Sequence, residues 1–244
     1  MNNITLSKLK TKVNLNRLRL NNSKKIGEGS FGSIFNLSNN KKTNKRYVVK
    51  KIKKDLNLKI LSFLGTGKFQ KELLEHEIEA LNELSKLDIS PKVYYYDNKE
   101  MIYIIDKLDY NLSEMITKNI LTHNHISKLI DVLKKLQRTK FKHNDLHSGN
   151  IMFSKNKNRF FIIDLGIFTI VNKCNNGVNK KICFNYEINN AKLLSDLFFY
   201  IKKNINSKKN TSNTKKQYSK KFDDLIKLFN IKEPNFKKDF LNSN

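Results

Sequence analysis

A glycine-rich run, Gly27-Glu28-Gly29-Ser30-Phe31-Gly32, is the feature that most restricts how this chain can fold. Glycines let a backbone approach phosphate groups that a side chain would block. Strand-like segments flank the run, with Ile26 before it and Ser33-Ile34-Phe35 after it. A dinucleotide-binding fold needs a helix N-terminus at this point, and no helical pattern follows. The sequence therefore disfavours a Rossmann domain and predicts a glycine-rich β-hairpin that covers a nucleotide.

The next charged residue of interest is Lys50, which lies in an apolar strand-like segment at 47–52. A lysine at the inner end of an apolar strand can reach the phosphates of a nucleotide, although a surface position is the ordinary alternative. A buried lysine needs a carboxylate to stay charged and in place. Glu77 lies on the following segment, where apolar residues recur at helical spacing over 69–87. The pattern predicts a Lys50–Glu77 ion pair.

A polar loop, His143-Asn144-Asp145-Leu146-His147-Ser148-Gly149-Asn150, follows an amphipathic helix predicted over 125–139. Its Asp145 can orient a hydroxyl group and accept its proton. Its Asn150 offers a carbonyl oxygen to a hard cation. A loop that connects regular elements is a usual place for such groups.

Asp164 is a second candidate metal ligand, which lies 14 residues after Asn150. Two short strands are predicted after Asn150, at 151–153 and 160–163, around a polar turn. Because a hairpin brings its two ends together, we expect Asp164 to lie beside Asn150. The two oxygen ligands would then bind a divalent metal that bridges phosphate oxygens.

The order of elements predicts an α+β fold with two segregated lobes. Strands and one helix come first, helices dominate later, and the boundary falls near 107–111. We expect a basic lead-in at 1–23, a β-rich lobe at 24–106 and a mostly helical lobe at 107–244. Within the second lobe, residues 191–201 predict a helix and 222–240 a final helical piece. The segment 202–221, with eight Lys and no acidic residue, predicts a linker or solvated loop.

The net charge of +26 suggests nucleic acid as a partner, but the composition argues otherwise. The chain has 43 Lys and 35 Asn against 5 Arg and 2 Ala, as an AT-rich genome would encode. A protein that reads RNA or DNA is expected to use more Arg, whose planar group grips phosphate and guanine. Nucleic acid is therefore a partner that the sequence does not favour.

Other classes of protein are also disfavoured. No apolar run approaches the ~18 residues of a membrane span. Cys174 and Cys183 are too few for a disulfide framework or a zinc site. The lead-in has no continuous apolar region of the kind found in secretory signals. We expect a cytoplasmic protein, or one of host cytoplasm or a virion if the source is a virus, and assume a monomer.

Together these motifs resemble the eukaryotic-type protein kinase superfamily over roughly residues 24–201. Ile26 to Ile34 is similar to the glycine-rich loop, and Val48-Val49-Lys50 to the third-strand lysine motif. His143-x-Asp145-x4-Asn150 resembles the catalytic loop, and Asp164-Leu165-Gly166 the metal-binding motif. Asp106-Lys107-Leu108 is similar to the hinge, and Asp196 to an aspartate that supports the catalytic loop. The hinge also resembles casein kinase 1 and vaccinia-related kinases, and the compact build resembles kinases of large DNA viruses.

The resemblance implies a bilobal kinase-like fold with a shortened helical lobe, and ATP-dependent phosphorylation of protein Ser/Thr. Asp145 would be the catalytic base, and Lys50, held by Glu77, would position the phosphates. Asn150 and Asp164 would hold Mg²⁺, with Mn²⁺ as an alternative. The implied nucleotide-binding residues are Ile26, Gly27, Glu28, Gly29, Ser30, Phe31, Gly32, Ser33, Ile34, Val48, Lys50, Asp106, Leu108 and Met152.

The chain also departs from the family. Asn144 replaces the usual arginine, and only Thr169 and Tyr186 carry a hydroxyl between Asp164 and Glu187. We therefore predict that phosphorylation of this segment does not switch the protein on. Only 48 residues follow Asp196, so we expect reduced substrate-docking helices.

Two alternatives remain open. A small-molecule kinase of the aminoglycoside or choline type shares the His-x-Asp-x4-Asn loop, but the glycine-rich loop and the hinge favour a protein kinase. A catalytically weak pseudokinase scaffold is the other. It is disfavoured because every phosphotransfer residue is present. The sequence does not identify the protein substrate.

Overall fold

The computed structural model covers the 244-residue chain and describes residues 24–29, 32–37, 46–53, 70–143, 145–170, 193–231 and 236–242. Several predictions lie outside these residues. They concern the lead-in at 1–23, the loop residues Ser30 and Phe31, Asn144, both cysteines, and the segment that holds Tyr186.

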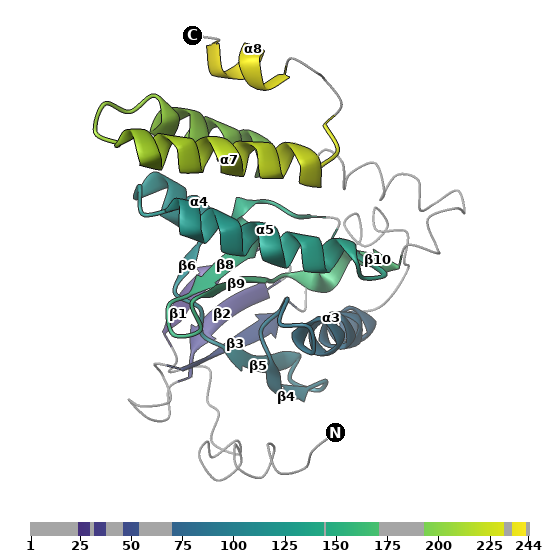
Figure 1. Ribbon diagram of the computed structural model, residues 1–244. Coiled ribbons are helices and arrows are strands. Elements are labelled where there is room, and N and C mark those ends of the chain that lie inside the picture. Colours follow the sequence, from purple (N-terminus) through teal and green to yellow (C-terminus); the bar gives the residue numbers. More distant parts are fainter. Residues whose placement is uncertain are drawn as a thin grey trace.

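The first half of the molecule is a five-stranded antiparallel sheet with a helix beside it (Figure 1). The strand order is β1-β2-β3-β5-β4. The strands are β1 (Lys25–Glu28), β2 (Gly32–Asn36), β3 (Tyr47–Ile52), β4 (Val93–Asp97) and β5 (Ile102–Asp106), and the helix is α3 (Gln70–Ser85). The predicted hairpin around the glycine-rich run is thus β1–β2, and the predicted helix at 69–87 is α3.

Helix α3 packs through one apolar face. Leu74, Ile78, Leu81 and Leu84 recur at helical spacing and are all buried. Glu77 lies on the same buried side and is only 1% exposed. The helix therefore carries a carboxylate into the core, where it needs a cationic partner.

The second half is mostly helical, as the α+β prediction requires. Its helices are α4 (Leu112–Thr117), α5 (His123–Gln137), a helical segment at 193–205, α7 (Ser212–Leu228) and α8 (Phe236–Asn242). A three-stranded sheet, β6 (Tyr110–Asn111), β8 (Ile151–Ser154) and β9 (Arg159–Ile162), lies against α5. The strands β7 (Phe141–His143) and β10 (Phe168–Ile170) pair with each other. The sequence patterns did not predict α4, β6, β7 or β10, which are short.

The hairpin β8–β9 confirms the folding pattern expected after Asn150. Ile151 pairs with Ile162, and the Ile163 amide donates to the Asn150 carbonyl oxygen at 3.0 Å. The chain therefore returns to its starting point, and Asp164 follows directly beside Asn150.

The prediction for residues 202–221 was wrong. Residues 193–205 are helical, and α7 begins at Ser212, so most of the presumed loop is helix. The final helical piece predicted at 222–240 is also wrong as a unit, because α7 ends at Leu228 and α8 begins at Phe236. Tyr218, Phe222 and Leu225 are the buried residues of α7, and their spacing forms an apolar stripe that extends into the lysine-rich segment.

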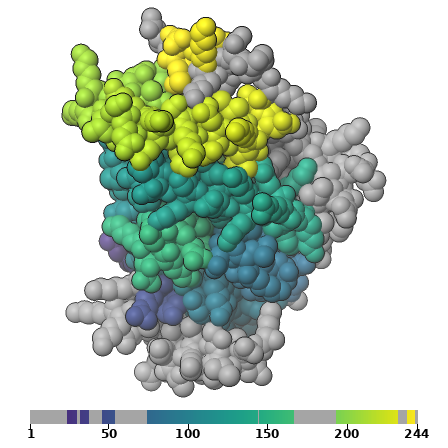
Figure 2. Space-filling model, in the orientation of Figure 1, coloured from purple at the N-terminus to yellow at the C-terminus, as the bar shows by residue number. Residues whose placement is uncertain are grey.

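One large apolar core joins the two halves. Its residues come mainly from β3, α3, β5, α4, α5, β8, β9, the helical segment at 193–205 and α7. Helix α7 lies across α5 on the side away from the β8–β9 hairpin (Figures 1 and 2). Within the described part of the chain, no helix has the length and apolarity that a membrane crossing requires.

Candidate active site

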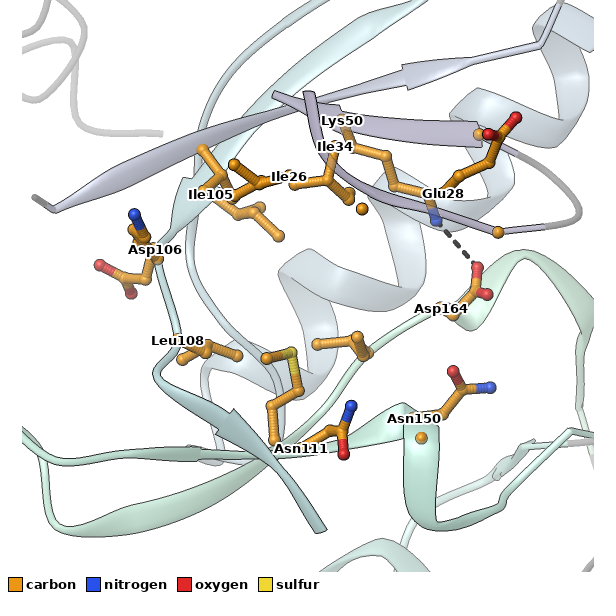
Figure 3. A pocket seen from close by; sticks show the side chains of 18 of the residues that line it. Ile26, Glu28, Ile34, Lys50, Ile105, Asp106, Leu108, Asn111, Asn150 and Asp164 are labelled. Atoms are coloured by element: carbon orange, nitrogen blue, oxygen red, sulfur yellow. Dashed lines mark hydrogen bonds and ion pairs between the residues drawn. The ribbon is translucent and has the colours of Figure 1, made fainter. Parts of the chain in front are cut away.

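A cavity of about 480 Å³ lies between the five-stranded sheet and the β8 strand (Figure 3). Most of the predicted nucleotide-binding residues line it. They are Ile26, Gly27, Glu28, Gly29, Gly32, Ile34, Val48, Lys50, Asp106, Leu108 and Met152, and the predicted metal ligands Asn150 and Asp164 also line it. Ser33 does not. Side chains alternate along a strand, so Ser33 in β2 is directed to the face opposite Ile34.

Lys50 is the centre of the charged end of this cavity. Its Nζ donates to Glu77 Oε1 at 2.7 Å and to Asp164 Oδ1 at 2.8 Å. Lys50 is 7% exposed, so both ion pairs form largely away from water. The three residues come from β3, from α3 and from the loop after β9. The structure thus contains the predicted Lys50–Glu77 pair and joins Asp164 to it.

Burial and charge act against each other in this cluster. Burial lowers the pKa of Lys50, but Asp164 and Glu77 outweigh it, so the pKa stays well above its usual value. Burial raises the pKa of Asp164, and the ammonium of Lys50 outweighs that effect and lowers it. At Glu77 burial is the larger effect and raises the pKa. The lysine is therefore a firmly charged group at the inner end of the cavity.

Tyr103 is a residue of this site that the sequence patterns did not identify. It is 1% exposed and lies opposite Lys50 in the β3–β5 ladder. The Lys50 Nζ lies 5.7 Å from the centre of its ring. Burial, together with the charge of Glu77, raises the pKa of Tyr103 well above its ordinary value. A tyrosine in an apolar strand is expected to be a core residue, so composition alone gave no signal for this contact.

The predicted catalytic loop is held by His143. Its Nε2 donates to the Ile163 carbonyl oxygen at 2.8 Å, and its Nδ1 accepts from the Asp145 amide at 3.2 Å. Both bonds require a neutral imidazole with the proton on Nε2. Burial lowers the pKa of His143, which favours that form. The imidazole therefore ties the backbone of Asp145 to the segment that leads into Asp164.

Asn150 and Asp164 face each other across the cavity floor (Figure 3). The Asn150 Nδ2 donates to the Asp145 carbonyl oxygen at 2.9 Å. The side-chain oxygen of Asn150 can therefore act as a metal ligand. Asp164 has a φ of 60°, a left-handed conformation that is uncommon outside glycine and that Asp adopts more readily than most other residues. One of its carboxylate oxygens contacts Lys50, so the other is available for a second partner.

This donor set fits Mg²⁺. One carboxylate and one amide oxygen are hard ligands, and Mg²⁺ at nucleotide sites usually takes one or two protein ligands plus phosphates and water. In the described residues no group of three or more His, Cys, Asp or Glu could hold a metal ion. A metal at this place would therefore need the phosphates of a bound nucleotide to complete its coordination.

His147 and Ser148, which are themselves part of this loop, make further hydrogen bonds that stabilise it. The His147 Nδ1 accepts from the Gly149 amide at 3.0 Å, and its Nε2 lies 3.8 Å from Asp145 Oδ2. A Cβ at Gly149 would come within 2.7 Å of the His147 ring, so an alanine here would push that ring away from its present place. The Ser148 hydroxyl donates to Asp196 Oδ2 at 2.9 Å. Asp196 thus contacts the loop that the resemblance implied it supports.

The opposite end of the cavity is more apolar. Ile26, Val48, Leu108 and Met152 line it together with Asp106. The side chain of Asp106 is engaged elsewhere, because it accepts from the Tyr94 hydroxyl at 3.0 Å and from Lys157 Nζ at 2.8 Å. The Asp106 carboxylate therefore bonds to other parts of the protein, and the backbone groups of Asp106 are the ones that remain for a ligand.

Glu28, at the mouth of the cavity, is also held by neighbours. It forms ion pairs with Lys25 and, at 3.0 Å, with Lys53. Hydrogen bonds from these two lysines lower the pKa of Glu28 to about 2. The Glu28 carboxylate therefore stays ionised, and its partners are the two lysines of the protein itself.

Two comparisons with known proteins bear on this site. The sequence pattern of the protein kinase domain matches residues 20–187, which is more than half of the chain. A probable serine/threonine-protein kinase of fowlpox virus (strain NVSL) is 29% identical over 96 residues, 37% of this chain. The match covers 31% of that viral protein, so the chain corresponds to less than a third of its length.

Proposed function

Because the chain belongs to the protein kinase family, we propose that it transfers the γ-phosphate of ATP to serine and threonine hydroxyls of proteins. The observation that carries this proposal is the contact of Lys50 with both Glu77 and Asp164, at 2.7 and 2.8 Å. It places one fixed positive charge at the inner end of a nucleotide-sized cavity. The fowlpox relative, itself a probable serine/threonine kinase, supports the choice of hydroxyl.

In this proposal the nucleotide lies along the cavity. Ile26, Val48 and Met152 would enclose the adenine, and backbone groups of Asp106 and Leu108 would bind its edge. The glycine-rich hairpin β1–β2 would cover the phosphates, where a Cβ would obstruct them. Lys50 would bind the α- and β-phosphates.

Asn150 and Asp164 would hold Mg²⁺ in this proposal, with Mn²⁺ as an alternative. When bound, the metal would neutralise charge on the phosphate oxygens. The chain's own part is to present one carboxylate and one amide oxygen side by side. The hydrogen bonds from Ile163 and from the Asn150 side chain keep those two groups in register.

Asp145 would be the catalytic base. The acceptor hydroxyl oxygen forms a bond to the γ-phosphorus, and the bond from that phosphorus to the β–γ bridging oxygen breaks. ADP leaves, and the hydroxyl proton passes to the Asp145 carboxylate. His143 and Asn150, which both contact the Asp145 backbone, hold the carboxylate in place.

We also propose the substrate class, the lobe boundary and the cellular location. Protein substrates follow from the family, and the lobe boundary would lie between β5 and α4, near residues 107–111. ATP-dependent chemistry and the poxvirus relative favour the cytoplasm of a host cell.

A transfer assay tests the proposal. The full chain is incubated with MgATP labelled at the γ-phosphate and a degenerate peptide library, and the phosphorylated residues are identified by mass spectrometry. We expect label on Ser and Thr, and a loss of about 10²-fold or more in Asp145→Asn. Asp131→Asn, an exposed carboxylate on α5, is the matched control and should transfer as the wild type does.

Two results would contradict the proposal. One is undiminished transfer by Asp145→Asn. The other is label on small-molecule acceptors, in a parallel metabolite panel, with none on peptides.

A further inference from the structure

The connecting segment, residues 106–109, joins the end of β5 to β6 and so links the two halves of the molecule. Asp106 and Leu108 line the cavity here, at the end away from Lys50 (Figure 3). In the described part of the chain, the backbone N–H and C=O groups of Leu108 have no hydrogen-bond partner. These groups are therefore free to bind a ligand, provided that the connecting segment holds them in place.

The Asp106 carboxylate is bound from both halves of the molecule. Its Oδ1 accepts from the hydroxyl of Tyr94, on β4, at 3.0 Å, and its Oδ2 accepts from the Nζ of Lys157 at 2.8 Å. Lys157 lies in the turn between β8 and β9, so the two donors come from opposite sides of the connecting segment. The Asp106 side chain is only 14% exposed, and hydrogen bonds are stronger where water is largely excluded.

Both donors are themselves held in place. The Tyr94 ring packs edge-on against the Tyr47 ring, with the ring centres 4.9 Å apart. Burial, together with the charge of Asp106, raises the pKa of Tyr94, so its hydroxyl keeps its proton and remains a donor. The Nζ of Lys157 lies 5.2 Å from the centre of the buried Phe161 ring. The two donors therefore reach Asp106 from packed surroundings.

The residues on either side of Leu108 are also attached to their own half. The Lys107 amide donates to the carbonyl oxygen of Arg46, just before β3, at 2.8 Å. The Asp109 amide donates to the carbonyl oxygen of Phe153, on β8, at 2.9 Å. These bonds attach the segment to each half separately, whereas the Asp106 carboxylate contacts both halves at once.

We propose that Tyr94 and Lys157 are positioning residues of the adenine-binding end of the cavity. By binding the Asp106 carboxylate from both halves, they keep the backbone groups of Asp106 and Leu108 at the spacing that the edge of an adenine needs. This inference rests on the proposed function, because it assigns those backbone groups to adenine. A site that already has its bound arrangement loses less conformational freedom on binding, so its affinity is higher.

Titration calorimetry with MgATP and MgGTP tests this role. Adenine carries an amino donor where guanine carries a carbonyl acceptor, so a correctly placed backbone carbonyl favours ATP. Tyr94→Phe keeps the ring and removes the hydroxyl. We expect it to weaken MgATP binding about fivefold, the size typical of one hydrogen bond, and to change MgGTP binding by less than about twofold. Lys157→Met should weaken MgATP binding about threefold, because its ion pair is partly exposed.

Tyr95→Phe is the matched control. Tyr95 is the next residue on β4, and its hydroxyl also bonds to an aspartate, Asp97, at 3.1 Å. Neither of these residues lines the cavity, so neither affinity should change. An equal loss of MgATP and MgGTP affinity in Tyr94→Phe would indicate a general structural role and would overturn the proposal, as would no loss of either.

A double-mutant cycle shows whether Tyr94 acts through Asp106. Asp106→Ala removes the carboxylate and keeps the backbone groups. In that background, Tyr94→Phe should weaken MgATP binding by less than about twofold. A further loss of about fivefold there would contradict the proposed route through the carboxylate.

The outcome also separates this inference from the proposed function. A wild-type protein that shows these binding effects but transfers no phosphate would keep Tyr94 and Lys157 as positioning residues and remove the proposed reaction. Phosphate transfer by the wild type, with unchanged MgATP affinity in Tyr94→Phe, would overturn the inference alone. A wild-type protein that binds neither nucleotide would overturn both.

Discussion

Two glycines of the β1–β2 hairpin differ in what surrounds them. A Cβ at Gly32 would lie 2.6 Å from the Lys51 carbonyl oxygen and 3.4 Å from Lys50 Cε. At Gly29 the nearest atom would be 3.9 Å away, an ordinary contact. Gly32 is therefore required by the backbone of β3, whereas no described residue would crowd a Cβ at Gly29.

This difference gives a stability prediction. Gly32→Ala should lower the free energy of unfolding by about 1–3 kcal/mol, because β2 and β3 must separate to admit the methyl group. Gly29→Ala should change it by no more than about 0.5 kcal/mol. Denaturant titration of both variants measures this. Equal effects of the two substitutions would refute the steric argument.

His143 makes the stability depend on pH. Burial lowers its pKa below the ordinary value of 6.5. As the pH falls through about 6.5, the unfolded chain takes up a proton at this residue. The folded protein does so only at lower pH. The unfolded state then binds more protons, so the free energy of unfolding falls as the pH falls, by up to about 1.4 kcal/mol per pH unit.

Urea unfolding between pH 7.5 and 5 measures that slope. His143→Gln lacks the titrating ring, and we expect its stability to fall less steeply over this range than that of the wild type. Parallel profiles would show that His143 is not the source.

At the scale of single residues, the sequence predicted proximities that follow from the local path of the chain. Asn150 and Asp164 had to meet because a hairpin joins them, and Lys50 needed a carboxylate. The contact of the Tyr103 ring with Lys50 could not be predicted, because it depends on the register of β3 against β5. The contact of Asp196 with Ser148, 48 positions apart, depends on packing between elements, so it was expected from the resemblance and not from the sequence pattern itself.

Among the elements, α7 departs most from its sequence pattern. Its exposed lysines suggested a solvated segment, but Tyr218, Phe222 and Leu225 form a stripe that packs on α5. The Tyr218 hydroxyl also donates to the Leu121 carbonyl oxygen at 3.2 Å. The predicted boundary at 221 separated Tyr218 from Phe222 and Leu225, so the helical spacing of the three apolar residues was not recognised. The longer helices α3 and α5 were predictable because each carries its whole stripe in one run.

The packing of α7 can be tested at Phe222. This side chain is fully buried, and its ring centre lies 4.5 Å from that of Phe198. Phe222→Ala should lower the free energy of unfolding by about 3–5 kcal/mol, because it leaves a cavity in the core. Lys220→Ala, an exposed position on the same helix, should change it by no more than about 0.5 kcal/mol. Chemical denaturation would contradict this packing if Phe222→Ala were as mild as Lys220→Ala.

For the whole molecule, the charge of +26 says little about the site. The cavity has the opposite balance, because its lining includes five carboxylates against two lysines. The acidic residues are Glu28, Asp106, Asp109, Glu114 and Asp164, and the basic ones are Lys50 and Lys107. A nucleoside triphosphate, itself an anion, would meet these carboxylates, of which Glu28 and Asp106 are already paired with lysines outside the lining. The bulk composition could predict neither this local balance nor the need for a cation that follows from it.

Metal removal tests that need. We expect a chelator to weaken ATP binding by about 10-fold or more, because the phosphates would then face Asp164 and its neighbours without a cation between them. Adenosine carries no phosphate, so its binding should be unchanged. Fluorescence or calorimetric titration with and without Mg²⁺ gives the comparison. Equal ATP affinity in both conditions would contradict the assignment of Asn150 and Asp164.

The central claim is that Lys50, fixed by Glu77 and Asp164, is the phosphate anchor of a phosphotransferase. The most direct measurement is γ-phosphate transfer by Lys50→Met and Lys51→Met. The two lysines are neighbours on β3, but only Lys50 lines the cavity. The account predicts a loss of about 10²-fold or more in Lys50→Met and nearly wild-type transfer in Lys51→Met. Equal transfer by the two variants would contradict it.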